Sequence, residues 1–263
     1  MTRSSMTDRL ADLRRSYTGE NLSQAVPAVR AGSPLIPAAS SVVQAELESR
    51  LLIAASAASS YLQFRPPASI IRPAHVFTAV SPGANVRLHL SPDALGPLLY
   101  ELVPRVEAGF PMGVQGLSYV QHRRSAELRL GAASAVLSGV DAAAWARGMR
   151  WVEWMVGFRG LDTVLWTGGV NDPVPELATG SALLRRVNLF ASASWIRVLP
   201  RDPWFVEWAG GPSVDAVEAA LRHPLGGADV SFGFRRQETP AVDIDPDLRT
   251  WPWPAEFVSV VTD

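Results

Sequence analysis

The chain contains no cysteine and no lysine, whereas it contains twenty-four arginines. Without cysteine it cannot form disulfides, thiolate metal sites or a cysteine nucleophile. Without lysine it cannot form a lysine Schiff base or supply the lysine of a phosphate-binding P-loop. Complete replacement of lysine by arginine in an alanine-rich chain is typical of codon bias in a GC-rich genome. A selected preference for planar, bidentate arginine contacts is the alternative.

Long apolar runs are also missing. No stretch of eighteen apolar residues occurs, which predicts that the chain has no transmembrane helix and no membrane partner. The first twenty residues lack the apolar core of a secretory signal. With 48% hydrophobic and 19% charged residues over 263 positions, the sequence predicts a folded protein with a sizeable core. We therefore expect a cytoplasmic protein.

The net charge of −1 is unevenly distributed. Residues 1–80 carry eight arginines and five acidic residues, whereas residues 161–263 carry eight arginines and fourteen acidic residues. The segment 237–263 has one arginine and six acidic residues. A basic front and an acidic tail could attract each other within one chain or between chains. Two solvated surfaces of opposite sign are the simpler interpretation.

Residues 1–41 are predicted to form a helical arm. Met6, Leu10, Leu13 and Tyr17 recur at helical spacing, which predicts a short amphipathic helix over 4–17. The remainder to residue 41 is rich in proline, alanine, glycine and serine and is predicted to be a linker. Because such a short helix is marginal alone, it should either dock on a partner surface or fray.

The segment 42–168 is predicted to hold a helix over 42–62 followed by an α+β unit. The expected strands are 86–90, 116–122, 126–130 and 162–168, and the expected helices are 91–106 and 138–158. This β-α-β-β-α-β sequence is the ferredoxin-like order. Residues 169–236 predict a β-β-α-β half that resembles an incomplete second copy. Residues 237–263 form an acidic tail with Trp251 and Trp253 between prolines.

Motifs of catalysis do not emerge from the sequence. There is no Gly-x-Ser-x-Gly elbow, Walker-A string or dinucleotide-binding fingerprint. The four histidines, His75, His89, His122 and His223, contain no i, i+4 pair suited to a metal. We predict no catalytic residue and no cofactor, and leave open whether the chain is an enzyme.

One weak metal candidate lies in the tail, where Asp243, Asp245 and Asp247 alternate. Carboxylates in such a loop can gather around Ca²⁺ or Mg²⁺. An EF-hand loop would need glycine where Leu248 stands and glutamate where Pro254 stands. A solvated acidic turn is therefore the preferred interpretation.

Candidate anion sites come from arginine doublets and from one glycine turn. The turn Gly210-Gly211-Pro212-Ser213 joins a predicted strand to a helix, where free backbone N–H groups can bind an anion. The doublets considered for anion or nucleic-acid contact are Arg123-Arg124, Arg185-Arg186 and Arg235-Arg236. Tyr119 and Phe232 or Phe234 could stack bases beside them. Ordinary capping and solvated surface pairs are the simpler interpretations.

Three functions follow from these patterns. The leading hypothesis is a non-catalytic protein that binds a protein partner or a copy of itself. It would use Leu10, Leu13 and Tyr17 of the arm, or Trp251 and Trp253 of the tail, because tryptophan is a frequent interface anchor. The first alternative is nucleic-acid binding through the arginine doublets. The second is a metal-dependent enzyme that acts on a phosphorylated small molecule.

Overall fold

The structure is a computed structural model that combines helices with one mixed five-stranded sheet and two smaller antiparallel sheets, so the α+β class is confirmed. It describes residues 5–32, 34–63, 76–107, 109–158, 164–165, 171–193, 195–200, 204–209, 211–228, 233–235 and 258–261. The helices are α1 (Met6–Thr18), α2 (Leu22–Arg30), α3 (Val42–Gln63), α4 (Leu95–Leu102), α5 (Ala142–Phe158), α6 (Leu177–Leu184) and α7 (Val214–Leu221), with a 3-10 turn η1 (Val187–Phe190).

The first sheet has five strands in the order β1-β2-β7-β6-β5. Its strands are β1 (Phe77–Ser81), β2 (Val86–Leu90), β5 (Leu117–His122), β6 (Ser125–Leu130) and β7 (Ala133–Ser138). The pair β2–β7 is parallel, and the other neighbours are antiparallel. One face carries apolar side chains such as Leu88, Leu128 and Leu137, which belong to the core. Strand β6 alternates between buried and more exposed side chains, as half-buried strands do.

The ferredoxin-like order is not seen. That order needs the strand after α5 to join the first sheet, but β8 (Val164–Leu165) pairs with β3 (Arg105–Glu107). Together with β4 (Phe110–Met112) they form a separate three-stranded sheet. The parallel partner of β2 is instead β7, which returns from β6 through a tight turn at Gly131 with a φ of 56°. Strand β7, which forms a hairpin with β6, therefore lies beside β2, where the ferredoxin-like order would place a different strand.

The second sheet has the order β11-β12-β10-β9. It contains β9 (Trp195–Leu199), β10 (Phe205–Ala209), β11 (Gly233–Arg235) and β12 (Val258–Val261). The expected β-β-α-β series is present as β9, β10, α7 and β11. The acidic tail contributes β12, which lies between β10 and β11.

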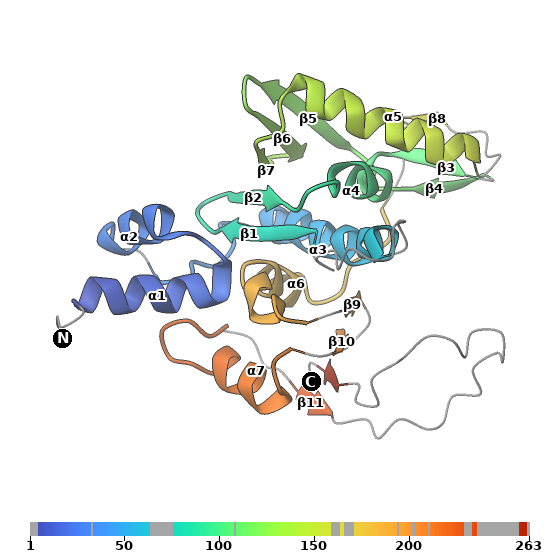
Figure 1. Ribbon diagram of the computed structural model, residues 1–263. Coiled ribbons are helices and arrows are strands. Elements are labelled where there is room, and N and C mark those ends of the chain that lie inside the picture. The colour runs from blue at the N-terminus through green and yellow to red at the C-terminus, as the bar shows by residue number, and fades with distance from the viewer. Residues whose placement is uncertain are drawn as a thin grey trace.

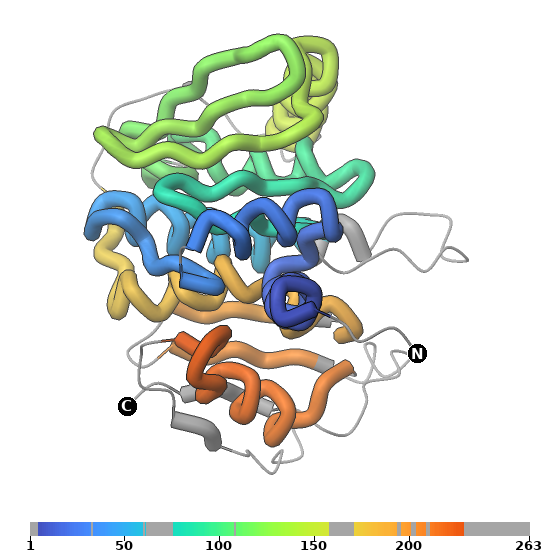
Figure 2. The backbone as a smooth tube through the Cα atoms, turned by 90° about the vertical axis from the view of Figure 1, so that its left-hand side faces the viewer, coloured from blue at the N-terminus to red at the C-terminus, as the bar shows by residue number. Residues whose placement is uncertain are grey.

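Helix α3 runs through the centre of the molecule, between the first sheet and α6 (Figure 1). Figure 2 shows α6 followed by the second sheet and α7 on the side away from β5–β7. Leu47, Leu51 and Ala58 on α3 are fully buried, and so are the polar Glu48 and Ser49. A helix that is buried on most sides belongs to the core of a protein rather than to its surface. It must therefore find partners for its own buried polar groups.

The N-terminal segment differs from its prediction in one respect. Helix α1 agrees with the expected helix: Ser5 and Asp8 form a capping box, and Gly19 ends the helix with a φ of 73°. Residues 22–30, however, form α2 instead of a linker. Asn21 and Gln24 make a second capping box, and Pro27 lies inside this short helix. The capping residues decided the structure here, although the proline-rich composition favoured a linker.

Candidate functional site

The anchored end of α1 holds Tyr17, one of the predicted interaction residues. Its side chain is 2% exposed, and its hydroxyl donates a hydrogen bond to the carbonyl of Ala220 at 2.7 Å. A Cβ atom added to Gly226 would collide with the Tyr17 ring, so only glycine allows this approach. Tyr17 therefore fixes α1 to the end of α7 and to the residues that follow it, in its own chain.

A buried ion pair reinforces this anchor. Arg14 Nε lies 2.5 Å from Glu20 Oε2, and both side chains are almost fully buried. Arg14 also donates to the carbonyls of Leu35 at 2.6 Å and Pro82 at 3.1 Å. Through Arg14 and Tyr17, the C-terminal half of α1 is thus tied to three distant segments, around Leu35, Pro82 and Ala220. Nothing in the local sequence pattern distinguishes Arg14 from a solvated arginine.

The other end of α1 points away from this anchor. Figure 1 shows α1 and α2 side by side at one edge of the molecule, with the N-terminal end outermost. Along the predicted apolar stripe, Tyr17 is buried, Leu13 and Leu10 are half-buried, and Met6 is 69% exposed. The apolar stripe of α1 is therefore buried at its C-terminal end and exposed at its N-terminal end.

The exposed doublet Arg123-Arg124 lies in the turn between β5 and β6. Tyr119 stacks on Trp145 with ring centroids 3.9 Å apart, so one face of its ring is already occupied. Glu127 lies on the outer face of β6, where the hydrogen bond from Arg129 lowers the pKa of its carboxyl to about 2. The ion pair with Arg129 compensates the charge of Glu127, so this carboxylate does not give the face a net negative charge.

The predicted glycine turn is only partly described. Ser213 caps α7, since its hydroxyl accepts a hydrogen bond from the backbone N–H of Ala216 at 3.2 Å. Gly211 has a φ of 74° and packs closely against Ala193. Arg185 and Arg186 lie at the end of α6, and their hydrogen bonds are made to residues outside this turn.

Several predicted residues lie outside the described part of the chain, namely His75, Gly210, Phe232, Arg236, Asp243, Asp245, Asp247, Trp251 and Trp253. Phe234 and Arg235 belong to β11.

The doublet Arg185-Arg186 lines a pocket of about 440 Å³, here called the arginine pocket. It lies between the segment 36–45 and α6, with Gly227 also in its lining. Most of the wall is apolar and is formed by Ile36, Ala39, Val42, Ala45, Leu177 and Ala182. The sequence identified the two arginines as anion candidates. It did not identify the segment that faces them, which lies more than 130 residues earlier in the chain.

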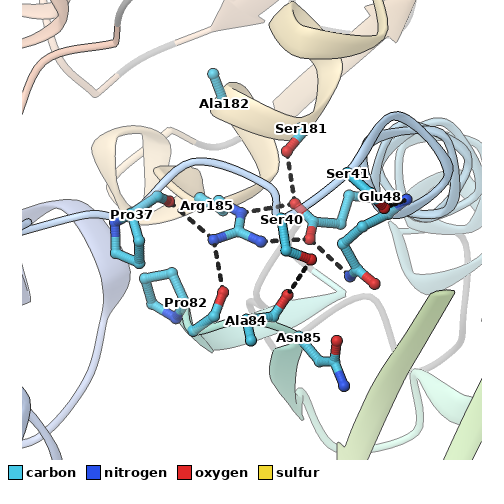
Figure 3. A network of polar contacts seen from close by, with 12 residues as sticks. Pro37, Ser40, Ser41, Glu48, Pro82, Ala84, Asn85, Ser181, Ala182 and Arg185 are labelled. Carbon is cyan, nitrogen blue, oxygen red and sulfur yellow. Dashed lines mark hydrogen bonds and ion pairs between the residues drawn. The ribbon is translucent and has the colours of Figure 1, made fainter. Parts of the chain in front are cut away.

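Arg185 is the centre of a buried polar network (Figure 3). Its guanidinium makes two bonds to the carboxylate of Glu48, at 2.7 and 2.6 Å, and both side chains are fully buried. It also donates to the carbonyls of Pro37 at 2.8 Å and Gly83 at 3.0 Å. Ser181 donates to Glu48 at 2.6 Å. The charge of Arg185 is therefore compensated within the protein.

Arg186 is buried without such compensation. Its side chain donates to the carbonyls of Ala182 at 3.0 Å, Gly226 at 2.9 Å and Gly227. In the part of the chain that the structure describes, no carboxylate forms an ion pair with it. The pKa of Arg186 is lowered to about 10, mainly by burial; Tyr17 opposes this shift and the nearby Arg185 contributes to it. The guanidinium is still protonated at neutral pH.

His89 is expected to make the stability of the protein depend on pH. Its Nε2 lies 3.0 Å from the Nε2 of Gln24, so the neutral ring accepts this bond from the amide. Burial and the nearby Arg87 lower the pKa of His89 below 6.5, against the effect of Glu20. Below pH 6.5 the unfolded state therefore binds more protons than the folded state, and the free energy of unfolding should decrease as the pH is lowered.

His89→Gln, which does not titrate, should flatten this dependence in urea unfolding between pH 7.5 and 5.5. Equal slopes for the two proteins would contradict the assignment.

The described residues contain neither a cluster of metal ligands nor a membrane-spanning helix. No group of three His, Asp or Glu side chains among the described residues is placed to hold a metal ion. No helix in the described part of the chain is both long and apolar enough to span a bilayer. Comparison of the chain with protein-family models, curated proteins and solved structures finds no match.

Proposed function

We propose that this protein is a non-catalytic assembly protein that associates with a second copy of itself through the outer half of α1. The observation that supports this is the apolar stripe of α1, which changes from buried at Tyr17 to 69% exposed at Met6. The anchored half holds the helix in place, and the outer half presents Met6 and the half-buried Leu10. A preformed helix loses little conformational entropy when it docks.

The charges around this stripe suit contact between identical copies. Asp8, Arg9, Asp12 and Arg15 alternate in sign along α1, and Arg15 pairs with Asp12 at 3.0 Å. A surface with equal numbers of both signs does not repel a copy of itself. In a two-fold arrangement the same patch meets itself in reverse, so acidic positions of one copy can face basic positions of the other.

Met6→Asp tests this proposal. The substitution places a charge at the exposed end of the stripe in both copies, and the dissociation constant of the dimer should rise at least about tenfold. Light scattering after size-exclusion chromatography over a range of concentrations measures the change in mass. Because Met6 is exposed, the free energy of unfolding of the monomer should change little.

Phe110→Asp is the matched control, since Phe110 is also 69% exposed but lies on β4. This variant should keep the mass of the wild type. A wild-type protein that stays monomeric at every concentration, or a Met6→Asp variant that keeps the wild-type mass, would overturn the proposal.

A further inference from the structure

The arginine pocket contains a buried positive charge that the described residues do not neutralise. Two guanidinium groups line it, and the single buried carboxylate nearby, Glu48, is bound to Arg185. Arg186 is 5% exposed and contacts carbonyl oxygens, which are dipoles without net charge. Three of its five N–H groups make these bonds. A buried charge without a counter-ion is costly, and an anion in the pocket would remove that cost.

The N-terminus of α3 reaches the same pocket. Ser41, Val42 and Ala45 line it, and Ser41 caps the helix by accepting a bond from the backbone N–H of Gln44 at 3.1 Å. The first turn of this 22-residue helix contains no acidic side chain. The partial positive charge of a helix N-terminus therefore adds to that of Arg186. Two independent features of the pocket favour a negative group.

The rest of the wall favours an apolar group. Alanine methyl groups and the side chains of Ile36, Val42 and Leu177 form most of it. Its volume of about 440 Å³ falls in the range of ~300–1,000 Å³ that is usual for small-molecule sites. A fully hydrated anion such as phosphate would leave these apolar atoms without contact. A ligand that pairs one negative charge with a short hydrocarbon body fits both parts of the wall.

We propose that the arginine pocket binds a small organic carboxylate with a short apolar chain, whose carboxylate lies at Arg186. The site is separate from the outer half of α1, so it does not depend on self-association. Arginine suits this role because its planar guanidinium can present two parallel N–H groups to a carboxylate. Ligand binding would also join the segment 36–45 to α6 more firmly.

Octanoate is a suitable probe, because it combines these two groups. Titration calorimetry on the full chain at neutral pH should show saturable binding of octanoate at one site, with a rise in melting temperature. 1-Octanol has the same chain without the charge and should bind about ten to a hundred times more weakly, as expected for loss of a charge-assisted hydrogen bond. Inorganic phosphate should not bind measurably at the same concentrations. Absence of octanoate binding, equal affinity for octanol, or equal affinity for phosphate would overturn the proposal.

Ala178→Phe tests the place of binding without touching the arginines. Ala178 is exposed at the edge of the pocket, so a phenyl ring can fill the space without disturbing the core. Octanoate affinity should fall at least about tenfold, while the melting temperature without ligand stays near that of the wild type. Ala146→Phe, at an exposed position of α5, is the matched control and should bind octanoate like the wild type. An Ala178→Phe variant with unchanged affinity would overturn the assignment to this pocket.

Discussion

Glu48→Gln is expected to lower the free energy of unfolding by about 3–5 kcal/mol, because it breaks a buried ion pair. Glu48 and Arg185 are both fully buried and are joined by two short bonds. Neutralising the carboxylate leaves the guanidinium without a counter-ion in the middle of the protein. The pair also connects α3 to α6, so its loss should reduce the cooperativity of unfolding between these two helices. Urea unfolding followed by circular dichroism measures the change.

Glu218→Gln provides the control for this prediction. Glu218 pairs with Arg222 at 2.8 Å on α7, where the Arg222 side chain is 68% exposed. Exposed pairs of this kind contribute about 0–1 kcal/mol, so this variant should unfold almost like the wild type. A Glu48→Gln variant that loses less than about 1 kcal/mol would show that water or another carboxylate compensates the charge of Arg185 in this network (Figure 3).

The Glu48–Arg185 pair also shows where sequence reasoning stops. The periodic pattern predicted a helix over 42–62 with Val43, Leu47, Leu51 and Ala54 in one apolar stripe. Helix α3 does bury Leu47, Leu51 and Ala54, whereas Val43 is 40% exposed. It also buries Glu48, which the same pattern would place among solvent-facing residues. A charged residue looks alike in a sequence whether it is solvated or paired. Its partner, Arg185, lies 137 residues away, and no local spacing could connect the two.

The same limit applies to the sheet and to the pocket. Alternating side chains predicted β2, β5 and β6 within one or two residues, because that pattern is local. The parallel pairing of β2 with β7 is not local. These strands were therefore predicted correctly, but the ferredoxin-like order in which they were expected to pair was wrong. Likewise, Arg185-Arg186 stood out as a doublet, but the wall opposite comes from residues 36–45. Composition described that segment only as rich in alanine and proline.

Tyr17→Ala is the second substitution with a large expected effect, of about 3–4 kcal/mol in the free energy of unfolding. It removes a ring that is 2% exposed and a hydroxyl that bonds to Ala220. The cavity would lie between α1 and the region around Gly226, and α1 would lose the contact that holds it to α7. Hydrogen exchange of the amides of α1 should then rise more than that of α3, whose contacts are untouched.

Tyr17→Phe separates packing from hydrogen bonding in the same position. It keeps the ring and removes only the hydroxyl, so it should cost about 1 kcal/mol. If Tyr17→Ala left both stability and exchange of α1 unchanged, α1 would be a detachable arm, as its sequence alone suggested. A large loss for Tyr17→Ala and a small one for Tyr17→Phe would instead show that α1 is an anchored element. Only an anchored helix holds the exposed Met6 end in a fixed position, and self-association through that end depends on it.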